Sequence, residues 1–160
     1  MLIICCLSIV GIAILDLWIK SRVEKKIKRG EEIPVCRGKI LLRHVHNEGM
    51  ALNMLDRYPK AVKWISIVMT GIVAVYALCL FGKHKNGLEK ISLSFLIGGA
   101  VSNLYDRIKR KYVVDYIGFK TKWKKLTDIT FNIGDFSIFA GALSDRWNKK
   151  VTMLVCDTVA

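Results

Sequence analysis

The sequence predicts an all-α membrane protein, in which four transmembrane helices carry a small β-sheet and a surface helix outside the bilayer. Three observations support this class. Hydrophobic residues make up 52% of the 160-residue chain, and the mean hydropathy is +0.33, which is high for a soluble domain. Four mainly apolar segments recur along the chain, as in multi-span proteins. Polar and strongly basic stretches separate them.

The first predicted span covers residues 1–19 and is almost wholly apolar. A cleaved signal peptide also contains an apolar run, but no basic region precedes this one and no A-x-A cleavage site follows it. Asp16 lies four residues before Lys20, which places both side chains on one helical face in the favourable order. An ordinary ion pair at the membrane interface is the alternative to a functional role.

Residues 20–60 form the first predicted loop region, which is polar and basic. Alternating residues within 39–46 predict a short strand. Asn47 and Gly49 follow as a turn, because both residue types tolerate positive φ. Residues 50–55 are apolar and predict a short helix or strand lying on the membrane surface.

The other three predicted spans cover residues 61–81, 91–107 and 131–146. In the third span, the small residues 98–100 would let a neighbouring helix approach closely. The second loop region, residues 108–130, contains a β-rich stretch at 112–119 that predicts another strand. On length, residues 1–160 form a single integral-membrane domain.

The net charge of +13 limits the classes of partner. In a soluble chain it would indicate nucleic acid, whereas a chain with apolar segments is more simply attracted to anionic lipid headgroups. We therefore expect membrane lipids and no nucleic acid among the partners. Four spans place both termini on one side, and most Lys and Arg residues lie in loops on the other side. The positive-inside rule alone would put those loops in the cytoplasm.

Two aspartates, Asp115 and Asp135, stand beside apolar segments, where a charge is costly to place. Asp115 lies in a strand pattern that could aim it inward, and Asn132 precedes Asp135 at helical spacing. If two carboxylates meet, the pKa of one must rise, so the pair offers one acid and one base. Water-driven peptide hydrolysis requires such a pair. The alternative is that each Asp pairs with one of the many Lys and Arg side chains.

Spacing alone reveals no metal-ligand set. The five cysteines are scattered without a CxxC pair, and the three histidines do not complete a set of ligands. His44 and His46 would share one face of a strand, but without a carboxylate or thiolate partner they are more simply interpreted as surface residues. We expect neither a metal site nor another cofactor.

Five motifs occur in order along the hydrophobic segments. They are Asp16-x-x-x-Lys20, Asn47-x-Gly49, Gly98-Gly99-Ala100-x-x-Asn103-x-x-Asp106-Arg107, Val113-Val114-Asp115-Tyr116 and Phe131-Asn132-Ile133-Gly134-Asp135. Together they resemble the motifs of the bacterial lipoprotein signal peptidases (signal peptidase II), integral-membrane aspartic peptidases with four spanning helices. No single motif is decisive, whereas five in order are specific, and the resemblance covers most of the chain.

The resemblance implies an endopeptidase that removes the signal peptide of prolipoproteins by cutting just before a Cys that carries a diacylglyceryl group. It implies that Asp115 and Asp135 are catalytic. The residues that it implies in substrate binding or support are Asp16, Lys20, Asn47, Gly49, Asn103, Asp106, Arg107 and Asn132. It also implies a multi-pass protein of the bacterial cytoplasmic membrane, without metal, with an extracytoplasmic sheet and the active site towards the outer face. We expect a monomer.

Four residues depart from the family's pattern. Met50 and Leu52 replace the small and aromatic residues that usually follow the first Asn-x-Gly, Ser102 stands where Gly is usual, and Gly134 stands where Ala is usual. The resemblance places these residues where the lipid-bearing substrate would dock. They therefore bear on the range of substrates more than on the reaction.

Two other functions fit parts of the sequence. A non-catalytic basic membrane protein could bind anionic lipid or a membrane partner, with the aspartates as structural ion pairs. A proton or ion pathway through paired carboxylates would need charges at several membrane depths, whereas the charges here gather towards one face.

Overall fold

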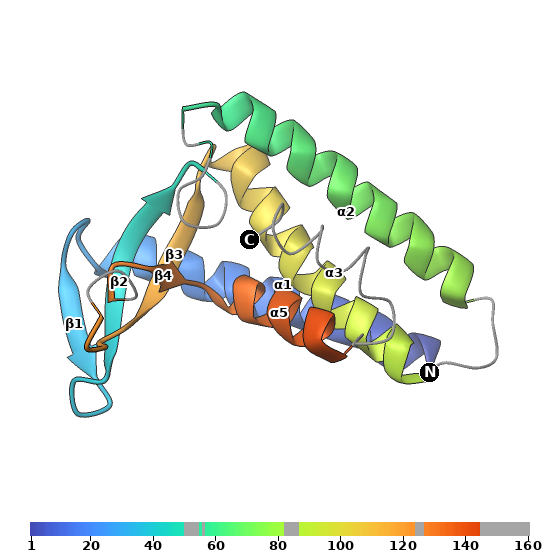
Figure 1. Cartoon of the computed structure of the whole chain (residues 1–160), viewed down its shortest axis with the longest axis horizontal. Helices are drawn as coiled ribbons and strands as arrows, with labels where there is room; N and C mark the ends of the chain where they lie inside the picture. Colours follow the sequence, from blue (N-terminus) through green and yellow to red (C-terminus); the bar gives the residue numbers. More distant parts are fainter. Residues whose placement is uncertain (50–54, 56, 82–86, 124–126, 145–160) are drawn as a thin grey trace.

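The computed structural model describes residues 1–49, 55, 57–81, 87–123 and 127–144, which are mostly helical with one small antiparallel sheet (Figure 1). The helices are α1 (Leu2–Lys26), α2 (Pro59–Phe81), α3 (Gly87–Lys109) and α5 (Ile133–Ser144). The strands are β1 (Glu32–Val35), β2 (Ile40–Asn47), β3 (Val113–Phe119) and β4 (Thr130–Phe131). The sheet stands at one end of the helices, and the N-terminus lies at the other.

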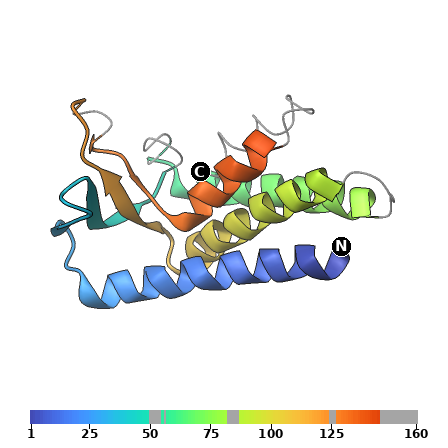
Figure 2. The ribbon, with the colours of Figure 1, turned by 90° about the horizontal axis from the view of Figure 1, so that it is seen from below.

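Helix α3 occupies the middle of the helical part and contacts α1, α2 and α5 (Figure 2). Small residues make this packing close, as the sequence predicts. A Cβ at Gly98 would lie 3.0 Å from the Cβ of Ile12 in α1. Gly99 faces the backbone of Gly134 in α5 so closely that no side chain would fit between the two helices.

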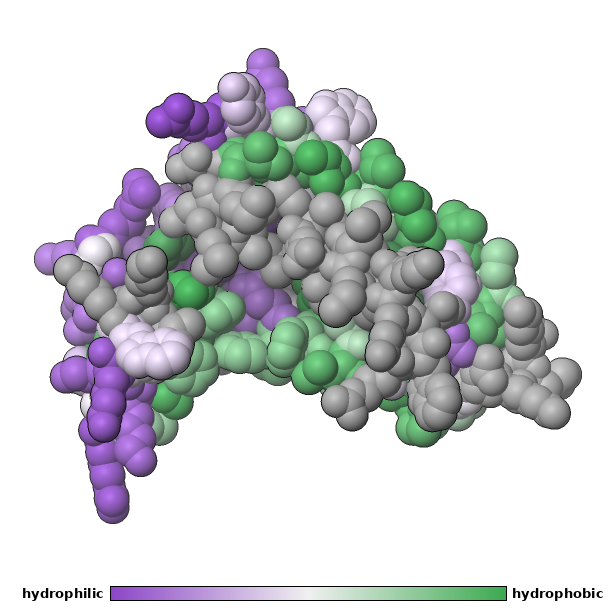
Figure 3. Space-filling model, viewed as in Figure 1, coloured by the Kyte–Doolittle hydropathy of each residue, from purple (hydrophilic) through white to green (hydrophobic). Residues whose placement is uncertain are grey.

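The outer faces of α1 and α2 are apolar and exposed. Ile3 in α1 is 75% exposed and Leu78 in α2 is 71% exposed. Figure 3 shows hydrophobic surface along much of the visible helical part, whereas most of the hydrophilic surface lies at the end of the molecule that carries the sheet. Both helices are long and apolar enough to cross a membrane. Exposed apolar area on this scale fits contact with lipid.

The predicted count of four spans is not confirmed, since among the described helices only α1 and α2 meet the length and composition expected of a span. Helix α5 has 12 residues and starts at Ile133, two residues later than predicted. Helix α3 is less apolar because it turns polar side chains towards the protein interior. Its buried polar residues are Lys90, Ser92, Ser94, Ser102, Asn103, Asp106 and Arg107.

The four strands are ordered β1-β2-β3-β4, and each neighbouring pair is antiparallel. The strands predicted at 39–46 and 112–119 are confirmed as β2 and β3. Strands β1 and β4 were not predicted, because β1 contains Pro34 in a polar stretch and β4 has only two residues. The predicted surface helix or strand at 50–55 lies outside the described residues, apart from Leu55.

Helix α1 continues to Lys26, beyond the predicted end of the first span. The last turns of α1 are polar, and a helix does not end merely because its residues become polar. The apolar run therefore predicts the length of the membrane segment and not the length of the helix. The added turns carry Val23 into a core shared with Val114 and Tyr116 of β3. This contact fixes the sheet against the end of α1.

Candidate active site

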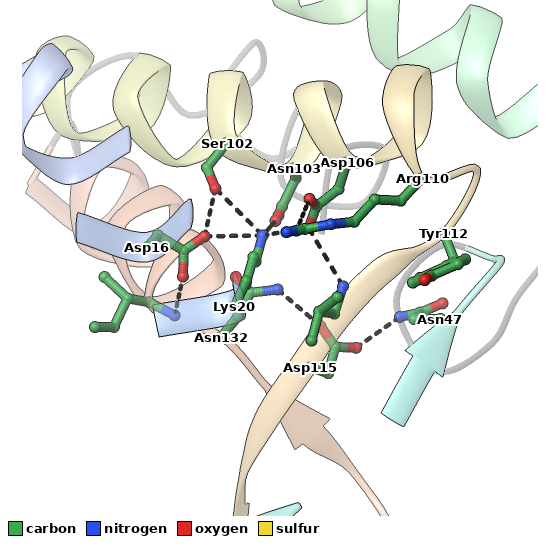
Figure 4. A network of polar contacts seen from close by, with 12 residues as sticks. Asp16, Lys20, Asn47, Ser102, Asn103, Asp106, Arg110, Tyr112, Asp115 and Asn132 are labelled. Atoms are coloured by element: carbon green, nitrogen blue, oxygen red, sulfur yellow. Dashed lines mark hydrogen bonds and ion pairs between the residues drawn. The ribbon is translucent and has the colours of Figure 1, made fainter. Parts of the chain in front are cut away.

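The candidate site lies where α1, α3 and α5 meet the sheet, and it is built of polar side chains from five elements (Figure 4). Every residue that the sequence indicated as a site residue is found within this region. All but Arg107 fall into two sets: a buried ion network around Lys20, and a pair of carboxylates, Asp115 and Asp135, held by Asn side chains and their supports.

Lys20 is the centre of the ion network and is completely buried. Its Nζ lies 2.8 Å from Oδ2 of Asp16 and 3.0 Å from Oδ2 of Asp106. It also donates to Oδ1 of Asn103 at 2.8 Å and lies 3.2 Å from the Oγ of Ser102. The predicted Asp16–Lys20 ion pair is confirmed, but it belongs to a wider network within the protein.

The two carboxylates beside Lys20 have further donors. Oδ1 of Asp16 accepts from the hydroxyl of Tyr116 at 2.8 Å and from the N–H of Ile133 at 3.1 Å. Asp106 is also paired with Arg110. Each buried carboxylate is therefore surrounded by donors, which is the condition under which a buried ion pair is tolerated. This network joins α1 to α3, β3 and the start of α5.

Asp115 on β3 accepts hydrogen bonds from two amides. The Nδ2 of Asn47 donates to Oδ2 at 3.0 Å, and the Nδ2 of Asn132 donates to Oδ1 at 2.7 Å. Asn47 also accepts from the N–H of Gly49 at 3.0 Å, which forms an Asx turn and fixes the amide. The turn predicted at Asn47–Gly49 therefore positions the amide group that donates a hydrogen bond to Asp115.

Asp135 lies in the first turn of α5 and forms a reciprocal cap with Asn132. The N–H of Asp135 donates to Oδ1 of Asn132 at 2.8 Å, and the N–H of Asn132 donates to Oδ2 of Asp135 at 3.0 Å. Asn103 donates to Oδ1 of Asp135 at 2.9 Å. Asn132 therefore contacts both Asp115 and Asp135 and sets their relative position.

The carboxylate pair differs from the ion network in its charge. Among the residues that the structure describes, neither Asp115 nor Asp135 has a Lys or Arg within ion-pair distance. The alternative in which each of these two aspartates pairs with a Lys or Arg is therefore not found within the described part of the chain, whereas Asp16 and Asp106 do form such ion pairs. Burial, and secondly the charge of Asp135, raise the pKa of Asp115. Its amide donors act in the opposite direction.

Arg107 of α3 is the remaining predicted residue, and it is 4% exposed. Its Nη2 donates to the carbonyl of Gly49 at 3.1 Å. Its Nε and Nη1 are buried, and among the described atoms they have no hydrogen-bond partner. Buried guanidinium donors are costly to leave unpaired, so this side chain has donors to offer to a bound molecule.

Three residues of the network were not predicted as site residues: Ser102, Arg110 and Tyr116. Ser102 donates to Oδ2 of Asp16 at 2.5 Å. Helical spacing of four residues from Asp106 could have indicated Arg110, but Tyr116 had no such signal. It lies on the face of β3 opposite to its neighbour Asp115, and only the approach of α1 reveals its partner.

Comparison with solved structures agrees with this architecture. One bacterial membrane enzyme, solved by the in meso method at 2.3 Å, matches with a TM-score of 0.75 and 25% identity over 91% of each chain. A second, solved at 1.9 Å, matches with a TM-score of 0.74 and 24% identity over 88% of each chain. The chain thus shares the fold of a bacterial membrane enzyme.

Residues 8–146 match the family model described as signal peptidase (SPase) II, and the chain belongs to that family. Its relatives include the lipoprotein signal peptidase of Halothermothrix orenii, 34% identical over 132 residues that cover 82% of this chain and 84% of the relative. The lipoprotein signal peptidase of Clostridium tetani is 36% identical over 130 residues, which cover 81% of each chain. The family match and these relatives define the chain as an aspartic peptidase.

Proposed function

We propose that this chain removes the signal peptide from prolipoproteins by hydrolysing the bond just before a diacylglyceryl-modified Cys, with Asp115 and Asp135 as its catalytic residues. The observation that carries this proposal is that Asn132 binds both carboxylates, Asp115 through its side-chain amide and Asp135 through its backbone N–H. Among the described residues, neither carboxylate has a Lys or Arg within ion-pair distance. Family membership supports the same reaction.

The reaction needs one carboxylate and one carboxylic acid. The ionised member of the pair accepts a proton from water as the water oxygen attacks the scissile carbonyl carbon. The protonated member then donates its proton to the leaving nitrogen as the C–N bond breaks. The products are a signal peptide with a new carboxyl end and a lipidated Cys with a free amine. The raised pKa of Asp115 suits the acid role at neutral pH.

The other site residues have supporting roles in this proposal. Asn47, Asn103 and Asn132 orient the carboxylates through their amides. Arg107 and Gly49 bind the substrate backbone, and the unpaired Nε and Nη1 of Arg107 support this assignment. Asp16, Lys20 and Asp106 brace the site through the buried ion network.

We place the whole chain, residues 1–160, in the bacterial cytoplasmic membrane as one multi-pass, monomeric domain. The proposed spans are residues 1–19, 61–81, 91–107 and 131–146. The central position of α3, enclosed by α1, α2 and α5, supports a span whose polar side chains face protein. The sheet and the active site face outwards, where lipid-modified substrates would approach from the membrane.

The proposed reaction is tested by mixing the purified full chain in detergent with a synthetic prolipoprotein peptide that carries a diacylglyceryl-modified Cys. We expect cleavage at the bond before that Cys, identified by the masses of both products. The matched control is the same peptide with an unmodified Cys, which should remain uncut. If a folded preparation cleaves neither peptide, or cuts both equally, the proposed substrate is wrong.

The pH dependence of cleavage should be bell-shaped. Below the lower macroscopic pKa of the pair both carboxyls are protonated and no base remains, while above the higher pKa both are ionised and no acid remains. Because the pKa of Asp115 is raised, we expect the alkaline limb well above the ordinary carboxyl range. Initial rates measured across the pH range would check this, and a flat profile would contradict a shared proton.

A further inference from the structure

A second cluster of chemically active side chains lies on the other face of the sheet. His44 and His46 extend from β2, and Glu24 extends from the last turns of α1. One ligand atom from each of the three residues lies within 4.8 Å of the others. The sequence predicted that the two rings share a face but showed no carboxylate partner. The structure brings that partner from 20 residues earlier in the chain.

The cluster is separate from the carboxylate pair. Along a strand, successive side chains point to opposite faces. Asn47 points towards Asp115 on one face, so its neighbour His46 points towards α1 on the other. Val114 of β3 lies opposite His46 and packs against α1, which confirms the assignment of the face.

The ring of His44 is oriented as a ligand would be. Its Nδ1 lies 2.8 Å from the carbonyl oxygen of Ile27, and since a carbonyl only accepts, Nδ1 carries the proton. The Nε2 of His44 therefore carries a lone pair, which in this structure accepts a hydrogen bond from the Nε2–H of His46, and a metal ion would take the place of that proton. Metal-binding histidines typically show this arrangement, in which the other ring nitrogen donates to a backbone carbonyl.

The Nε2 atoms of His44 and His46 are 3.0 Å apart. Two nitrogens bound to one tetrahedral Zn²⁺ at about 2.0–2.1 Å would be separated by roughly 3.4 Å. The observed pair needs only a small movement to reach that distance. The ring of His46 is also held in place by stacking on Tyr112, with centroids 3.7 Å apart and an interplanar angle of 12°.

Glu24 is held by two donors. The hydroxyl of Tyr112 donates to Oε1 at 2.8 Å, and the Nε of Arg110 lies 3.1 Å from Oε2 (Figure 4 labels both donor residues). Each carboxylate oxygen has a second lone pair, so Glu24 can bind a cation without losing these contacts. Tyr112 thus supports two members of the cluster at once.

The charges around the cluster nearly balance. The cations that face it are Arg29 and Arg110, and the carboxylates are Glu24 and Glu48. Arg110 also forms an ion pair with Asp106 and donates to the hydroxyl of Ser21. Its positive charge is therefore partly compensated by the ion network around Lys20. A divalent cation would therefore meet a site whose own charge is close to neutral.

We propose that Glu24, His44 and His46 form a binding site for a divalent transition metal of the zinc class, with the fourth position open to water. Two imidazoles and one carboxylate suit such ions, whereas Ca²⁺ and Mg²⁺ prefer oxygen alone. The ion would tie the end of α1 to β2 and so stabilise the sheet against the helices. This site goes beyond the proposed peptidase chemistry and supplies no step in it.

The direct test uses the full chain purified in detergent without a polyhistidine tag and stripped with a chelator. Titration with Zn²⁺ should give one bound equivalent and a higher Tm, and Co²⁺ should give visible absorption typical of nitrogen and oxygen ligands. Absence of any bound equivalent in folded protein would overturn the proposal, independently of whether peptidase activity is found.

Variants locate the binding. We expect His46→Ala and Glu24→Gln each to weaken Zn²⁺ affinity by about 100-fold, and Tyr112→Phe, which removes only the donor to Glu24, by about 10-fold. His84→Ala, which removes the third histidine of the chain, and Asp115→Asn should both bind as wild type does. Equal affinity in a folded His44→Ala/His46→Ala double variant would place the metal elsewhere and overturn the assignment.

Discussion

Replacing Asp115 or Asp135 by Asn should reduce cleavage of the lipidated prolipoprotein peptide by about 10³-fold or more. Asn keeps the size of the side chain but can neither accept a proton from water nor donate one to the leaving amine, and a positioned acid or base contributes about 10²–10⁴-fold. Because the proposed mechanism uses the two carboxyls as a unit, the double variant should be hardly worse than either single one. Single-turnover rates for the three variants would check both statements.

The control for this pair is Asp128→Asn. Asp128 is exposed, and its replacement removes one negative charge without touching the amide contacts of the pair. It should cleave at close to the wild-type rate. If Asp115→Asn and Asp135→Asn, folded and stable, keep their rates, the carboxylates are structural. In that case a non-catalytic membrane protein that binds anionic lipid or a membrane partner becomes the better explanation of the basic surface.

Replacing Lys20 by Met should lower the free energy of unfolding by about 3–5 kcal/mol. The substitution keeps a long unbranched side chain but leaves Asp16 and Asp106 buried without the cation between them. It also removes the donor to Asn103, which in turn holds Asp135. Activity should therefore fall with stability. Reversible denaturation in detergent, followed by circular dichroism, would measure the loss.

Lys25→Met is the matched control, because Lys25 is an exposed residue of the same helix. Its effect should stay within about 0.5 kcal/mol. If Lys20→Met unfolds at the wild-type denaturant concentration, the two carboxylates do not depend on Lys20 for their charge balance. The ion network would then be irrelevant to stability, and its bracing role in the proposed function would be lost.

The helices and the two long strands of this fold could be predicted because their patterns are local. Apolar runs marked α1 and α2, and alternation marked β2 and β3. What could not be predicted depends on other parts of the chain. Strand β4 has two residues and exists because β3 lies beside it. Helix α3 is polar where it faces protein, so composition alone does not reveal its surroundings.

The candidate site shows the same division. Motif spacing found Asn103, Asp106 and Arg107, which lie within about one helical turn. It also found Asn132 and Asp135, which form a cap. It did not find Tyr116, whose partner Asp16 is 100 residues away in sequence. Nor did it find the Glu24 that completes the histidine cluster, because the contact arises only when α1 continues past the apolar run and reaches the sheet.

The position of Asn132 has a consequence for how the protein is made. This residue caps the last described helix and also binds the carboxylate of β3, so the two aspartates acquire their relative geometry only when α5 has formed. During translation, Asp115 is synthesised before Asn132 and Asp135. A partly synthesised chain therefore contains one of the two carboxylates and lacks the amide that aligns them. Under the proposed function, proteolytic competence would arise late in biogenesis, after the preceding helices have been synthesised.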